Sequence, residues 1–300
     1  MHHLSLGIVF MFIASFFFAI MNAFIKILSQ TISPVENLFF RSIIMTFFML
    51  LFLAIQKKPI IKKSGGWHKL FFRAFIGGLS MLALFYNIAT IPLSIATTFA
   101  QSTPLYVLLF SLLFLKERIP FTIIIAGIIG FIGIIFICNP FGQPLAPINI
   151  IMGIFSGGGA ALALITLRSL KEYFENSFII LFFGLSMSIV GGIIILLPVF
   201  FIDNSWHTPN SFEWWIIILM GLSGTIGQHF LTKAYMAAPA GIVAPIDYVK
   251  ILWGIFMGVY LGDSLPNIET WSGILLILFS GILIALPIFI KDYKRIKNGY

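Results

Sequence analysis

Ten apolar segments, separated by short polar or proline-containing breaks, succeed one another along this chain of 300 residues. A helix of about 20 apolar residues spans the hydrocarbon core of a bilayer, and each segment comes close to that length. Hydrophobic residues make up 60% of the chain and charged residues 9%, against about 25% charged residues in soluble domains. We therefore predict an all-α polytopic membrane protein with ten transmembrane helices. The predicted helices cover residues 4–28, 34–55, 71–90, 93–115, 120–138, 148–168, 178–202, 212–235, 239–262 and 270–290.

The positions of the lysines and arginines predict the topology. Fifteen of the 18 basic residues, including Arg73, fall in the loops after the second, fourth, sixth and eighth segments and in the C-terminal tail. The opposite loops contain no Lys or Arg. Because basic residues concentrate in cytoplasmic loops, we expect a protein of the cytoplasmic (inner) membrane with both termini in the cytoplasm. This arrangement explains the net charge of +8 without a nucleic-acid partner.

The first segment and the single cysteine exclude two other features. The first segment is longer than a signal-peptide core of about 7–15 residues and has no basic leader, so we expect it to be retained as a helix. Cys138 is the only cysteine, which excludes an internal disulfide and a cysteine-based metal cluster.

The two halves of the sequence repeat each other. Proline and glycine positions recur 146 or 147 residues apart: Pro92 and Pro239, Pro120 and Pro266, Gly127 and Gly273. Each half contains five segments, so we expect residues 1–140 and 148–300 to form two five-helix repeats. An odd number of helices places the second copy in the membrane in the opposite orientation, as in many secondary transporters.

Three stretches of the chain carry a family resemblance. They are 33–41 (SPVENLFFR), 89–120, and 234–248 (AYMAAPAGIVAPIDY). On these stretches, and in the order and topology of its two halves, the chain resembles the EamA-type ten-helix members of the drug/metabolite transporter superfamily. The resemblance implies a secondary transporter of small metabolites in the cytoplasmic membrane. One departure is that the fourth segment ends in Glu117-Arg118, whereas its counterpart in the second half has Asp263-Ser264.

Five ionisable residues fall inside the predicted helices or at their ends: Lys26, Glu36, Arg41, Asp247 and Lys250. Such groups are costly in hydrocarbon, and they face a cavity or one another. Asp247 and Lys250 stand three residues apart, so they share a helix face near mid-membrane, where transporters bind substrate. The alternative for this pair is an ion pair that only fixes helix packing.

Neighbouring residues complete the predicted site. Tyr248 and Trp253 flank the charged pair, and aromatic rings attract cations and planar groups. Pro245 is expected to kink this helix, because proline lacks a backbone donor. Glu36 and Arg41 are expected on the outer approach to the site.

Other polar residues of the predicted helices are weaker candidates. His229, next to Gln228, either lines the site or relays protons, or it forms an interhelical hydrogen bond. The polar residues of the first, third and fourth segments have the same two alternatives, with interhelical bonding favoured slightly: Asn22, Tyr86, Asn87, Gln101, Ser102 and Thr103. Pro104 is expected to bend the fourth segment. Glycines four residues apart are expected at close helix contacts: Gly153 and Gly157, and Gly254, Gly258 and Gly262.

The sequence predicts transport by elimination as well as by resemblance. It contains no phosphate-binding loop, HExxH motif or GxSxG motif, so we expect neither an enzyme nor an ATP-driven pump. Energy then comes from an ion gradient or from exchange. No cofactor and no metal are expected, and the expected partners are a small-molecule substrate and the bilayer, with a homodimer left open.

The charges of the predicted site indicate a substrate class. They include one more cation than anions, which favours an amino acid or a derivative such as S-adenosylmethionine. We expect the two halves to move around this site by alternating access. The alternatives are a multidrug or cation exporter of the same superfamily, a channel, or an intramembrane enzyme.

Overall fold

The computed structural model describes residues 2–28, 30–56, 60–91, 99–138, 145–197, 206–260 and 268–297. Within these ranges the regular structure is helical, apart from one isolated antiparallel bridge between Ile61 and Phe174. Helices dominate because a chain in lipid must satisfy its backbone hydrogen bonds internally. The predicted all-α class is confirmed.

Ten helices of eleven residues or more run through the described part of the chain, in good agreement with the predicted segments. In the first half they are α1 (His2–Leu28), α2 (Pro34–Ile55), α3 (Trp67–Thr90), α5 (Thr103–Leu113) and α6 (Phe121–Cys138). In the second half they are α7 (Pro147–Leu170), α8 (Asn176–Leu196), α9 (Ser211–Ala237), α11 (Val249–Tyr260) and α12 (Ile268–Lys297).

Five helices are long and apolar enough to cross a membrane by length and composition alone: α1, α2, α7, α8 and α9. Three shorter apolar helices cover Phe99–Leu113, Phe121–Phe136 and Trp271–Ile284. Helix α3 begins four residues before the predicted segment and so includes Lys69 and Arg73 in its first two turns. Arg73 was counted with the loop charges although it falls within the predicted helix 71–90, and it lies in the second turn of α3.

The predicted helix over 239–262 is interrupted. Its described part consists of a short helix α10 (Ala240–Val243), a 3-10 helix η1 (Ala244–Tyr248) and α11. Pro245 lies in η1, where it removes a backbone donor and prevents regular α-helical bonding. Pro104 acts similarly in the fourth segment, since α5 starts at Thr103 after a turn at Ser102.

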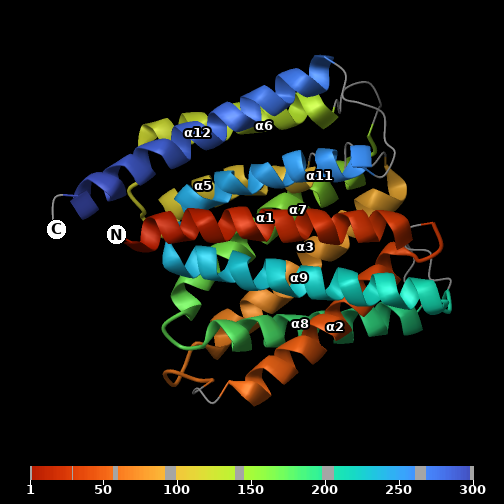
Figure 1. Cartoon of the computed structure of the whole chain (residues 1–300). Helices are drawn as coiled ribbons and strands as arrows, with labels where there is room; N and C mark the ends of the chain where they lie inside the picture. Colours follow the sequence, from red (N-terminus) through yellow and green to blue (C-terminus); the bar gives the residue numbers. More distant parts are fainter. Residues whose placement is uncertain are drawn as a thin grey trace.

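The helices pack in pairs that join the two halves of the chain. Helix α1 packs on α9, α3 on α7, α2 on α8 and α6 on α12, while α5 contacts α7 and α11 contacts α1. If each long helix is replaced by its counterpart in the other half (α1 by α7, α3 by α9, and so on), this set of pairs maps onto itself. Figure 1 shows α6 and α12 along one edge of the bundle and α2 and α8 along the opposite edge.

The start of α1 and the end of α12 lie at the same end of the bundle (Figure 1), as an even number of crossings requires. We call this the terminal end and the opposite one the distal end. Large apolar side chains such as Phe47, Phe75 and Leu196 are exposed on the surface of the bundle, as expected of faces that contact lipid.

Some of the glycines lie at close helix contacts. A Cβ on Gly153 or Gly157 would collide with Phe99 or Ser102, which confirms the predicted packing role of these two residues. Gly254 was predicted to have the same role, but a Cβ there would meet no atom within 4 Å, so that prediction is wrong. Gly262 lies outside the described residues.

Gly133 offers a direct test of the packing between α6 and α12. A Cβ on Gly133 would lie 2.7 Å from the backbone oxygen of Gly273, whereas one on Gly158 in α7 would meet nothing within 4 Å. We expect Gly133→Ala to destabilise the protein by about 1–3 kcal/mol through overpacking. Gly158→Ala should leave stability unchanged or raise it slightly, since Ala is the better helix former. Melting temperatures of the purified variants check this, and equal melting temperatures would contradict the described α6–α12 contact.

Candidate functional site

Asp247 and Lys250 form an ion pair on the interrupted helix. Lys250 Nζ lies 2.8 Å from Asp247 Oδ2, and the two side chains are 21% and 18% exposed. The second carboxylate oxygen, Oδ1, is buried and has no hydrogen-bond partner among the described residues. The pair is therefore half-buried and keeps one free acceptor, as a ligand-binding carboxylate requires. Gly254, one turn beyond Lys250, borders open space.

The aromatic neighbours of the pair point to other helices. Tyr248 is 1% exposed, and its ring packs against Gly130 in α6 and into a cluster with Ile134 and Ile277. Trp253 contacts Phe12 and Phe16 of α1, with ring centroids 5.6 and 5.1 Å apart. These two side chains anchor the interrupted helix between α1, α6 and α12.

Arg41 of α2 is buried without a carboxylate partner among the described residues. It is 7% exposed, and its Nε atom is buried and has no hydrogen-bond partner among the residues that the structure describes. The side chain reaches α9 at Gly224, where a Cβ would lie 3.2 Å from Nε and 2.8 Å from the sulfur of Met21. A glycine at 224 thus makes room for a buried cation at the junction of α1, α2 and α9.

Glu36 serves the local structure at the distal end. Its carboxylate accepts the backbone N–H of Ser33 at 2.8 Å, while the Ser33 hydroxyl accepts the N–H of Glu36, which makes a capping box for α2. The other carboxylate oxygen accepts the backbone N–H of His207 at 2.6 Å. Glu36 therefore joins the α1–α2 turn to the segment that leads into α9, and its two oxygens are already bonded.

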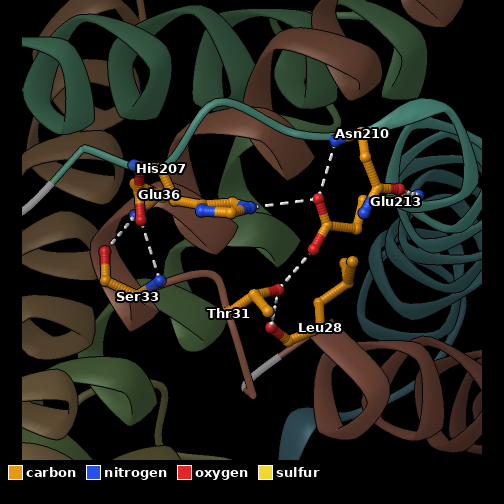
Figure 2. A network of polar contacts seen from close by, with 7 residues as sticks. All are labelled: Leu28, Thr31, Ser33, Glu36, His207, Asn210 and Glu213. Atoms are coloured by element: carbon orange, nitrogen blue, oxygen red, sulfur yellow. Dashed lines mark hydrogen bonds and ion pairs between the residues drawn. The ribbon is translucent and has the colours of Figure 1, made fainter.

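A second capping box faces the first one (Figure 2). Glu213 and Asn210 cap α9 in the same way, and Thr31 donates to Glu213 at 2.5 Å. His207 Nε2 lies 3.1 Å from the Glu213 carboxylate. We call the six residues of this network the distal clasp: Thr31, Ser33, Glu36, His207, Asn210 and Glu213.

The terminal end has corresponding contacts between the halves. Lys62, between α2 and α3, forms an ion pair of 3.0 Å with Glu175, which precedes α8. The bridge between Ile61 and Phe174 joins the same two turns. The distal clasp joins the turn before α2 to the segment before α9. The Lys62–Glu175 contact joins the turn before α8, the counterpart of α2, to the turn before α3, the counterpart of α9.

Glu117 forms a further connection at the terminal end. Its carboxylate is 3.0 Å from Arg168, at the end of α7. It also accepts the backbone N–H groups of Ala240 and Gly241, each at 3.3 Å, and so caps α10. We call the residues of these two contacts the terminal clasp: Lys62, Glu117, Arg168 and Glu175, with the amides of Ala240 and Gly241.

The weaker candidates have varied positions. His229 is 3.1 Å from the side-chain amide of Asn176 in α8, so it forms the predicted interhelical hydrogen bond. Asn87 bonds to Asn149 of α7 in the same manner. Asn22 is exposed on α1, whereas Tyr86 and Gln101 are half-buried. Four of the expected site residues, Asp247, Tyr248, Lys250 and Trp253, thus lie on the interrupted helix, while Arg41, Glu36 and His229 lie elsewhere.

Several residues that connect the two halves were not predicted from the sequence. Arg168 and Glu117 were counted as loop charges or helix ends, and His207 was not singled out. A readable signal existed for the distal clasp, because Ser33-x-x-Glu36 and Asn210-x-x-Glu213 both have capping-box spacing. Among the described residues, no group of three or more His, Cys, Asp or Glu side chains could hold a metal ion.

Comparisons with known proteins point to one class. The EamA-like transporter family matches residues 5–139. The chain is 45% identical to an uncharacterized transporter of Helicobacter pylori, over 97% of this chain and 98% of the relative. It is 30% identical to the pseudopaline exporter CntI of Pseudomonas aeruginosa, over 94% and 96% of the two chains.

More distant similarities agree with this class. The S-adenosylmethionine uptake transporter of Rickettsia conorii is 26% identical, over 84% of this chain and 83% of the relative. A crystal structure with 17% sequence identity superposes with a TM-score of 0.76, covering 93% of this chain and 96% of the other, so the two share a fold.

A double-mutant cycle tests the ion pair on the interrupted helix. We expect Lys250→Met and Asp247→Asn each to lower the melting temperature, because each leaves a half-buried charge without its partner. The double variant should lose less stability than the two single variants lose together, with a coupling energy of roughly 1–2 kcal/mol. Strictly additive losses in thermal unfolding would show that the two side chains do not interact.

Proposed function

From the premise that this chain belongs to the EamA-like transporter family, we propose that it moves a small polar metabolite across the cytoplasmic membrane by alternating access. The relatives are known as transporters or exporters. We further propose a class of substrate, the residues that bind the substrate, and two gates.

The ion pair of Asp247 and Lys250 carries the proposal. Asp247 lies seven residues beyond the start of α10, which corresponds to about 10 Å at 1.5 Å per residue. Transporters bind substrate near mid-membrane on discontinuous helices, and η1 makes this helix discontinuous. An ionisable pair is costly at such a depth, so a role in binding explains its presence better than packing alone.

The charges available to a substrate favour a zwitterion. Glu36 is occupied by its capping bonds, which leaves Asp247, Lys250 and Arg41. An amino acid, or a derivative such as S-adenosylmethionine, presents a cationic group to Asp247 and a carboxylate to Lys250. The name of the rickettsial relative supports this class.

The two clasps are the proposed gates. We infer two inverted repeats, residues 1–140 and 148–300, and their support is the set of helix pairs that maps onto itself when the halves are exchanged. Both clasps join one half to the other, one at each end of the bundle. Access from one side then requires one clasp to open while the other stays closed. The basic loops support a cytoplasmic location of the terminal end.

Transport by proteoliposomes tests the binding role of Asp247. We expect wild-type protein to accumulate radiolabelled S-adenosylmethionine or one amino acid of a labelled panel, with saturation. Asp247→Asn should lower uptake at least about tenfold, since a hydrogen bond to a charged group contributes about 1.5–3 kcal/mol and about 1.4 kcal/mol is a factor of ten. Glu172→Gln, in an exposed position before Glu175, is the matched control and should transport normally.

Two results would contradict this proposal. Unchanged uptake by Asp247→Asn would remove Asp247 from the site. Saturable uptake of a lipophilic cation, with none of the zwitterions transported, would favour a cation exporter of the same family.

A further inference from the structure

Arg73 is a buried cation that the proposed transport step does not use. It lies in the second turn of α3 near the terminal end and is 3% exposed. The other basic residues nearby are at the surface or satisfied: Lys62 pairs with Glu175, and Lys63 and Lys69 lie over the ring of Tyr173. Arg73 differs from all of them in its burial.

The surroundings of Arg73 are apolar. Its guanidinium carbon lies 4.6 Å from the ring centroid of Phe183 in α8. Phe183 belongs to a cluster with Met45, Met49 and Ile180. A cation–π contact stabilises a guanidinium through its face, and it leaves the N–H edge available for hydrogen bonds.

No described carboxylate neutralises this charge. At the terminal end Glu175 pairs with Lys62 and Glu117 pairs with Arg168, while Glu172 is exposed. The Nε atom of Arg73 is buried and has no hydrogen-bond partner among the described residues. A buried charge without a counter-ion is strongly destabilising, so an anion bound to this guanidinium would stabilise the protein.

We propose that Arg73 and Phe183 form an oxyanion-binding site between α3 and α8. A carboxylate or phosphate group binds the edge of the guanidinium through two N–H donors, a geometry that arginine favours, while the face stays on Phe183. The group belongs either to a small soluble molecule or to the headgroup of an anionic lipid at that membrane surface. Lys63 and Lys69 on the same side attract anions toward the site.

The position of Arg73 mirrors that of Arg41. Arg41 lies where α2 meets α9, and Arg73 lies where α3 meets α8. When each helix is replaced by its counterpart in the other half, the α2–α9 interface becomes the α8–α3 interface. Each of them thus contains one buried guanidinium without a carboxylate partner in the described part of the chain, one toward each end of the bundle. The Arg73 site does not depend on which substrate the protein transports.

Thermal unfolding of the purified full-length protein in a neutral detergent tests this site. One arm compares sodium phosphate and sodium succinate with sodium chloride at matched ionic strength. The other arm compares phosphatidylcholine vesicles with and without phosphatidylglycerol. The variants are Arg73→Met and, as a matched control, Arg118→Met, which removes an exposed arginine at the same end of the bundle.

We expect an oxyanion to raise the melting temperature of wild type and Arg118→Met by several degrees, and Arg73→Met to show no increase. In chloride Arg73→Met should be at least as stable as wild type, because its buried charge is gone. A response to phosphate or succinate alone identifies a soluble ligand, and a response to phosphatidylglycerol alone identifies a lipid headgroup.

Three outcomes would overturn the site. They are an equal oxyanion response in Arg73→Met and wild type, the absence of any response in wild type, and a failure of both Arg73→Met and Arg73→Gln to fold. The last outcome would assign Arg73 to the fold, because Gln keeps a polar side chain without the charge.

Discussion

The cost of placing a charge in hydrocarbon governs where the ionisable groups of this chain lie. In the described residues, four acidic side chains at the two ends of the bundle cap helices or pair across the two halves: Glu36, Glu213, Glu117 and Glu175. Deeper in the bundle, Asp247 and Lys250 neutralise each other. Two arginines, Arg41 and Arg73, are buried with no described carboxylate partner, and this is why each indicates a binding site.

The terminal clasp is bonded directly to the interrupted helix. Glu117 bonds to the first amides of α10 and thereby fixes the start of the helix that carries Asp247. The same carboxylate pairs with Arg168 of α7, so the terminal clasp is coupled through the chain to the proposed substrate site. Loss of these bonds would free both the gate and the helix. Tyr248 and Trp253, packed on α6 and α1, hold the segment after the break in place.

Much of the fold could be predicted, because bilayer thickness sets helix length and the loop charges set topology. The break within 239–262 was only indicated by Pro245, since a proline kink and a change to 3-10 geometry look alike in sequence. Arg73 was counted with the loop charges because it follows five lysines of that loop, although the predicted helix already began at residue 71. The ion pair of Asp247 and Lys250 followed from spacing. The packing of Tyr248 toward α6 did not, because it depends on Gly130 in the other half.

The central claim is that the two clasps close opposite ends of one pathway. A Gly254→Cys variant in a Cys138→Ser background places a reactive thiol in open space, one helical turn beyond Lys250. Its labelling by a membrane-impermeant maleimide can be measured in right-side-out and inside-out vesicles. We predict that Glu213→Gln increases labelling only from the outside and Glu117→Gln only from the inside. Increased labelling from the same side in both variants, or from neither side, would contradict the account.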